Sequence, residues 1–110
     1  MAFDEQLAGR VWKLLEELPD ASERRMFGGV AFMVGGHIAC GVIGHELMLR
    51  LGEQEADAAL ESEHVRPFDF TGRPSRKAVF VGPAALESDA ALAGWVERAV
   101  AHTRRLPPKR

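Results

Sequence analysis

The sequence predicts an α+β domain in which helices pack on one face of an antiparallel sheet. Residues 26–51 are apolar almost throughout and are interrupted by paired glycines, as expected for consecutive strands. Amphipathic segments with helical spacing lie before and after this stretch. At 110 residues the chain can bury a core as one domain. We predict a single domain over residues 1–110, with the element order α-β(3)-α-β(2)-α and a basic tail over 104–110.

The apolar stretch predicts a three-stranded meander. Gly35-Gly36 separates two apolar runs, and a Gly-Gly pair in this position indicates a tight hairpin. We expect a second turn at Gly44-His45, followed by a strand in which three leucines share one face: Leu47, Leu49 and Leu51. Both faces of the first strand are apolar. This is typical either of a central strand covered on both sides or of a strand that uses one face for binding.

Amphipathic helices are predicted at both ends of the chain. Residues 4–18 carry apolar side chains at helical spacing, with Asp4 as a suitable N-cap and Trp12 packed in the core. The last helix is expected to begin at Ser88 or Asp89, because apolar residues then recur at positions i, i+3 and i+4.

The remaining segments are shorter. Residues 20–25 are polar and are predicted to form a connection into the meander. Residues 53–62 are rich in alanine and acidic residues, which indicates a short helix on the edge of the sheet. Short strands are expected within 64–70 and at 78–81, joined by a loop over 71–77.

Composition excludes several classes of protein. The net charge of −2 gives no general attraction to nucleic acid, so direct nucleic-acid binding is not expected. No apolar run is long enough to span a membrane, and the acidic N-terminus lacks the pattern of a secretory signal. The single cysteine, Cys40, fits a reducing compartment. We therefore expect a cytoplasmic protein that is not associated with a membrane.

No pattern of residues indicates a metal site. His37, Cys40 and His45 are close in sequence, but strand alternation directs Cys40 away from His37. Cys40 lies among apolar neighbours in mid-strand, where a thiol is usually buried and inert. We predict a core cysteine and no bound metal.

Catalytic and cofactor-binding patterns are equally hard to find. The glycine pairs form neither a dinucleotide-binding fingerprint nor a phosphate-binding loop. Asp69 is the only acid within a strand-like run, and its neighbours Arg66 and Arg73 favour a structural ion pair over acid–base chemistry. We therefore expect no catalytic residues and no cofactor, and we do not expect an enzyme.

Two motifs resemble those of a known family. MFGG at 26–29 and DFTGRP at 69–74, followed by Trp95-Val96 and the closing LPPK at 106–109, resemble the N-terminal domain of TfoX/Sxy proteins. The resemblance extends over nearly the whole chain and implies a two-layer fold similar to type III secretion chaperones. It also implies regulation, since the best-known members activate natural competence together with a cyclic-AMP-responsive activator. Those members carry a separate C-terminal domain, whereas we expect a stand-alone N-terminal domain here.

The two motifs supply the candidate residues for contact with a partner or ligand: Met26, Phe27, Gly28, Gly29, Thr71, Gly72 and Arg73. A structural explanation of MFGG is also open, in which the glycines allow a bulge or close packing and Met26 and Phe27 lie in the core. For the second motif the alternatives are a surface turn and an arginine, Arg73, that is presented to an anionic partner.

Two hypotheses about function remain open. In the first, the chain is a non-enzymatic domain that binds a protein partner, such as a transcription factor, or itself as a homodimer, through the open face or edge of the sheet. In the second, it is a ligand-binding or enzymatic domain with a pocket between sheet and helices, floored by Met26 and Phe27 and gated by Arg73. DNA binding by the basic tail is the weakest alternative, because the rest of the chain is acidic.

Overall fold

The computed structural model describes residues 3–26, 28–69, 72 and 75–107. In chain order its elements are α1 (Glu5–Leu15), β1 (Ala21–Met26), β2 (Gly29–Val34), β3 (His37–Ile43), β4 (Glu46–Arg50), α2 (Glu53–Ala59), β5 (Val65–Phe68), β6 (Ser75–Val81), the 3-10 helix η1 (Pro83–Ala85) and α3 (Asp89–Arg104). The described helices and strands confirm the predicted α+β class.

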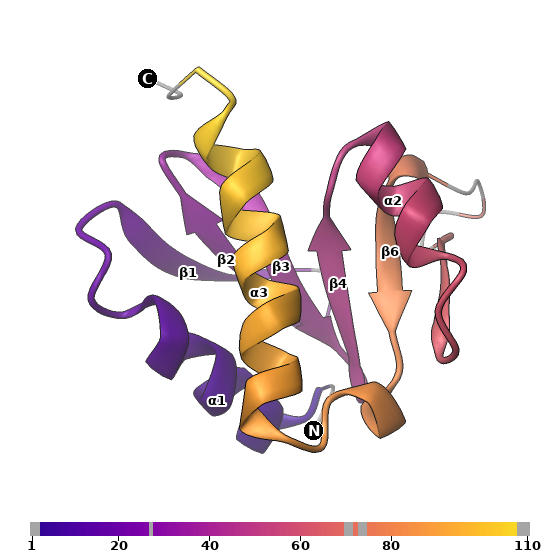
Figure 1. The fold of residues 1–110 in the computed structure, drawn as a ribbon. Helices are drawn as coiled ribbons and strands as arrows, with labels where there is room; N and C mark the ends of the chain where they lie inside the picture. Colours follow the sequence, from indigo (N-terminus) through magenta and orange to yellow (C-terminus); the bar gives the residue numbers. More distant parts are fainter. Residues whose placement is uncertain (1–2, 27, 70–71, 73–74, 108–110) are drawn as a thin grey trace.

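One antiparallel sheet organises the molecule. Its strands lie in the order β1-β2-β3-β4-β6-β5, and every neighbouring pair is antiparallel. The helices gather on one face, with α3 crossing β3 and β4, α1 beside α3, and α2 against β6 (Figure 1). The other face carries no helix from the described part of the chain, and we call it the open face. None of the described helices has the length and apolar character that a membrane span requires.

The polar segment 20–25 corrects the predicted order of elements. We expected a connection there, but Ala21–Met26 forms β1, so four strands rather than three precede α2. β1 is an edge strand that pairs only with β2, and its four middle side chains are exposed. Backbone hydrogen bonds hold such a strand without an apolar face, and polar side chains protect the edge from pairing with other chains. A polar segment can therefore form an edge strand without apolar alternation in its sequence.

The predicted turns of the meander are confirmed. Gly35 and Gly36 have φ angles of 61° and 84°, as a tight turn with the twist of the flanking strands requires. Gly44 has a φ of 59° and joins β3 to β4. Both turns set the register, because β3 then pairs with β2 on one side and with β4 on the other.

Both end helices begin where the sequence predicts. The Asp4 carboxylate accepts a hydrogen bond from the Leu7 amide at 3.0 Å, and the Ser88 hydroxyl accepts one from the Ala91 amide at 3.0 Å. These side chains satisfy amide groups that the first turn of a helix leaves free. The first helix ends at Leu15, earlier than predicted from its apolar spacing.

The main core lies between the helices and the sheet. Phe32 on β2 is fully buried, and its ring stacks against Trp12 of α1 with centroids 6.2 Å apart. The three leucines of the alternating strand are all buried as predicted: Leu47, Leu49 and Leu51. Most of the buried apolar side chains therefore lie on the helical side of the sheet, and the open face is not covered by this core.

Cys40 is a core residue, as predicted. Its side chain has no exposed surface, and burial raises the pKa of the thiol to about 12. Because the thiolate is the reactive form, we expect the native protein at pH 8 to resist a thiol-specific reagent such as Ellman's reagent. The same protein in guanidinium should react fully. Rapid reaction of the native chain would show that the sheet opens or that Cys40 is exposed.

Candidate functional site

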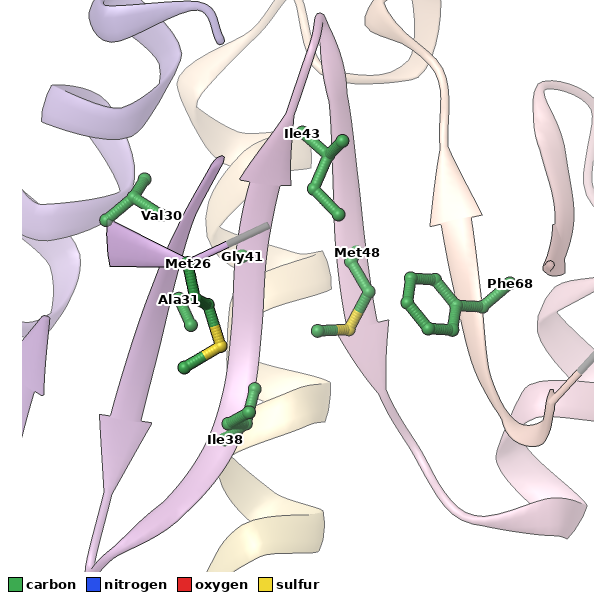
Figure 2. A pocket seen from close by; sticks show the side chains of 8 residues that line it. All are labelled: Met26, Val30, Ala31, Ile38, Gly41, Ile43, Met48 and Phe68. Carbon is green, nitrogen blue, oxygen red and sulfur yellow. The ribbon is translucent and has the colours of Figure 1, made fainter. Parts of the chain in front are cut away.

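An apolar hollow of about 160 Å³ lies on the open face of the sheet (Figure 2). Its lining comes from five strands and contains no titratable side chain: Met26, Val30, Ala31, Ile38, Gly41, Ile43, Met48 and Phe68. We call this hollow the open-face groove. Figure 2 shows Met26 and Met48 from two different strands on either side of Gly41, with the Phe68 ring beyond Met48.

Small residues in the central strands create the hollow. Ala31 pairs with Gly41 across β2 and β3, and Gly41 pairs with Met48 across β3 and β4. Directly paired residues point to the same face of a sheet, so the hollow lies where the side chains of this row are shortest. A Cβ atom at Gly41 would lie 2.8 Å from the Val30 carbonyl oxygen, so the position admits only glycine without movement. The groove therefore follows directly from residue size and register.

An ion-pair cluster supports one wall of the groove. Arg66 donates through Nε and Nη2 to the Glu46 carboxylate, at 2.9 and 2.6 Å, and through Nη1 to Asp69 at 2.9 Å. Its guanidinium lies 4.5 Å from the centroid of the Phe80 ring, which in turn contacts Phe68 with centroids 4.9 Å apart. These carboxylates raise the pKa of Arg66, with Glu46 contributing most. The cluster holds the Phe68 wall in place and confirms the structural role predicted for Asp69.

The free charge of the open face is positive. Arg24 pairs with Ala31, and strand alternation places Arg76 on the same side as Phe80. Neither arginine forms an ion pair with a described carboxylate, whereas both acids of this face, Glu46 and Asp69, are bound to Arg66. An apolar hollow on a face that also carries unpaired arginines favours a ligand that is apolar at its centre and acidic around it.

A family model now identifies the domain. The model described as the TfoX N-terminal domain matches residues 13–103. The chain belongs to the TfoX N-terminal domain family. The matched region includes every strand of the sheet and every residue of the open-face groove. Comparisons with curated proteins and with solved structures found no match.

The TfoX-like motif MFGG has mixed roles. Met26 lines the open-face groove and lies outside the helix-covered core, so its predicted core position is wrong, whereas its binding role stays a prediction. Gly29 is a close-packing residue, because a Cβ atom there would overlap the carbonyl oxygen of Val42. Gly28 has a φ of 73° in the turn between β1 and β2. Phe27 lies outside the described residues.

The second TfoX-like motif is described only in part. Gly72 has a φ of 87°, and its amide donates to the Asp69 carbonyl oxygen at 2.9 Å. Of the predicted surface turn over 71–74, the structure describes only Gly72, which is exposed. Thr71 and Arg73 lie outside the described residues, so their predicted binding roles stay predictions.

The position of the groove corrects the second hypothesis. We expected a pocket between the sheet and the helices, with Met26 in its floor. The hollow beside Met26 is instead lined by strand residues alone and lies on the open face (Figure 2). The reason is that large leucines, valines and Phe32 fill the space between the two layers.

Seven of the eight groove residues were not predicted as site residues: Val30, Ala31, Ile38, Gly41, Ile43, Met48 and Phe68. The sequence contained a signal for three of them, namely Ile38, Ile43 and Met48. Their neighbours of opposite parity form the core, and strand alternation therefore leaves an apolar side chain on the open face at each of these positions. An apolar residue on the second face of a strand is therefore a signal of a binding surface.

Proposed function

We propose that this TfoX-family domain is a protein-interaction domain whose open-face groove binds an acidic amphipathic segment of a partner protein. The observation that carries the proposal is the size and lining of the groove. A cavity of about 150 Å³ accommodates a molecule such as benzene, whereas small-molecule sites commonly measure about 300–1,000 Å³. At about 160 Å³ the groove suits one large apolar side chain.

Two methionines make the groove adaptable. The side chains of Met26 and Met48 are unbranched and polarisable, and such residues are common at surfaces that accept more than one apolar shape. The groove residues include no group that could act as an acid, base or nucleophile. This lining supports a binding domain over an enzyme.

Charge selects the partner over a second copy of the chain. In a symmetric dimer each open face meets the same face of the other copy, so Arg24 and Arg76 would add positive charge to both sides of the interface. An acidic segment meets the same arginines with opposite charge. We therefore propose a monomer that binds a different protein.

The cellular role is a finer part of the same proposal. The family resemblance implies that the partner is a transcription factor and that the complex acts in the cytoplasm to regulate competence. A domain that docks on an activator through one face fits that role without catalysis. The identity of the partner and the pathway are left to experiment.

Two peptides of equal length test the proposal. Both carry leucine and phenylalanine at helical spacing, and their remaining positions are glutamate in one and lysine in the other. We expect fluorescence anisotropy to show at least about tenfold tighter binding of the acidic peptide. Equal affinities would overturn the charge argument. Sedimentation of the chain alone should show a monomer at micromolar concentration, and a dimer that excludes the peptide would assign the groove to a second copy.

A further inference from the structure

A second pocket lies away from the open-face groove, where the ends of β4 and α3 meet β6. Its volume is about 390 Å³, which falls within the range of small-molecule sites. Basic side chains from β4, β6 and the C-terminal end of α3 line it: Arg50, Lys77, His102 and Arg105. We call it the basic pocket. We propose that the basic pocket binds a small phosphate-bearing molecule.

Unsatisfied positive charge is the first reason. Elsewhere Arg10, Arg66, Arg98 and Arg104 each form an ion pair with a carboxylate. In the described part of the chain no carboxylate pairs with the side chain of Arg50, Lys77 or Arg105. Gathering like charges that no carboxylate pairs with is unfavourable unless an anion completes the group.

Two acids also line the basic pocket and must be counted. Glu55 accepts a hydrogen bond from Arg98 Nη2 at 3.4 Å, so its charge is already engaged. Glu53 has no ion-pair partner among the described residues. Three cations against one free carboxylate leave a positive pocket in a chain whose net charge is −2.

The geometry around His102 is the second reason. The Leu51 and Gly52 amides donate to the Lys77 carbonyl oxygen at 2.8 and 3.0 Å, which joins the end of β4 to β6. Gly52 has a φ of 83°, and a Cβ atom there would lie 2.9 Å from Cε1 of His102. The imidazole therefore packs directly on a backbone that only glycine suits, and the wall of the pocket is fixed before any ligand binds.

The electrostatic environment of His102 agrees with an anion site. Burial lowers the pKa of His102, and the positive charges of Arg50, Arg105, Lys77 and His37 lower it further. Three of these groups lie on β3, β4 and β6, and Arg105 is the residue that follows α3. Arginine and lysine both suit phosphate oxygens, arginine through paired hydrogen bonds and lysine as a point charge. An oxygen-rich dianion is the ligand that this group would stabilise best.

A small molecule is favoured over nucleic acid. Nucleic-acid binding needs a basic surface that follows many phosphates, and the described part of the predicted basic tail does not supply one. Arg104 is bound to Asp20 instead of lying free for a phosphate. The basic pocket is one concave site, and the acidic first turn of α2 borders it on one side.

The test uses inorganic phosphate as the probe and the NMR signal of His102 Cε1–H as the readout, at low ionic strength. We expect a saturable shift with a dissociation constant at or below about 1 mM. Arg50→Gln and Arg105→Gln should each weaken binding about tenfold, since each removes a charge-assisted hydrogen bond. The control Lys13→Gln removes a cation of α1 that pairs with no described carboxylate and lies outside the basic pocket, and it should leave the affinity within about twofold.

Three outcomes would overturn the proposal. The first is a shift that does not saturate, and the second is an equal loss of affinity in the Lys13→Gln control. The third outcome comes from a comparison of two phosphate sources, a phosphate monoester and a short DNA duplex. Saturable binding of the duplex alone, with an affinity that falls steeply with salt, would assign the pocket to nucleic acid. Circular dichroism of each variant should match the parent chain, and the choice of two arginines keeps the test valid if one variant misfolds.

Discussion

Replacing Met48 with glutamate should weaken binding of the acidic amphipathic peptide by at least about 100-fold. Met48 lies in the centre of the open-face groove, between Gly41 on β3 and Phe80 on β6. The substitution removes an apolar wall from the anchor site and places a negative charge beside an acidic ligand. Fluorescence anisotropy with the labelled peptide measures the change directly.

Two companion variants make this result interpretable. Leu60→Glu introduces the same charge at an apolar side chain that is 37% exposed and lies beyond α2, away from the groove. It should bind the peptide within about twofold of the parent chain, because surface changes outside an interface contribute little. Met48→Gln keeps the length of the side chain without the charge and should lose less affinity than Met48→Glu. If Leu60→Glu loses as much as Met48→Glu, the peptide does not bind in the groove.

Replacing Phe32 with alanine should lower the free energy of unfolding by about 3–5 kcal/mol. Phe32 is fully buried in the middle of β2 and stacks on Trp12 of α1, so the substitution leaves a cavity at the contact of helix and sheet. Chemical denaturation in guanidinium, followed by tryptophan fluorescence, measures the loss. The result would establish that stability depends on the helical side of the sheet.

The neighbouring residue on the other face provides the control. Met33 follows Phe32 in β2, points to the open face and is only partly buried. Met33→Ala should lower the free energy of unfolding by only about 1 kcal/mol, because the Met33 side chain buries less apolar surface than Phe32 does. Equal losses for Phe32→Ala and Met33→Ala would mean that both faces of the sheet carry the core.

The fold could be predicted largely from local patterns. The glycine pair at 35–36, the alternation of leucines in β4 and the caps at Asp4 and Ser88 each act over a few residues, and each appears in the structure. β1 could not be predicted in this way. An edge strand is held by its neighbour rather than by an apolar pattern of its own, so a polar segment gives no local sign of it.

The candidate sites depend on contacts between distant parts of the chain. Met26 and Phe68 come from strands near opposite edges of the sheet, and the strand order that relates them is not encoded in any single segment. The basic pocket likewise depends on topology, because Lys77 of β6 and His102 of α3 are far apart in the sequence and line the same pocket. Residue type and periodicity predict which side chains face outward, whereas topology decides which of them meet.

The two motifs of the TfoX family illustrate how one pattern can hold different roles. In MFGG the glycines serve the backbone: Gly28 takes a left-handed turn and Gly29 lies against the neighbouring strand. Met26 of the same motif supplies a wall of the groove. A motif in one sequence therefore predicts an important place in the fold more securely than it predicts a function for each of its residues.

The most direct test of protein docking is a methyl NMR map of the whole chain during titration with the acidic amphipathic peptide. The proposed site predicts that the largest shifts occur at the methyl groups of Met26, Ile38, Ile43 and Met48. Methyl groups between the helices, such as Leu92 and Val96, should move little. Shifts concentrated on the helical layer, or no saturable shift at the four groove residues, would contradict a docking site on the open face.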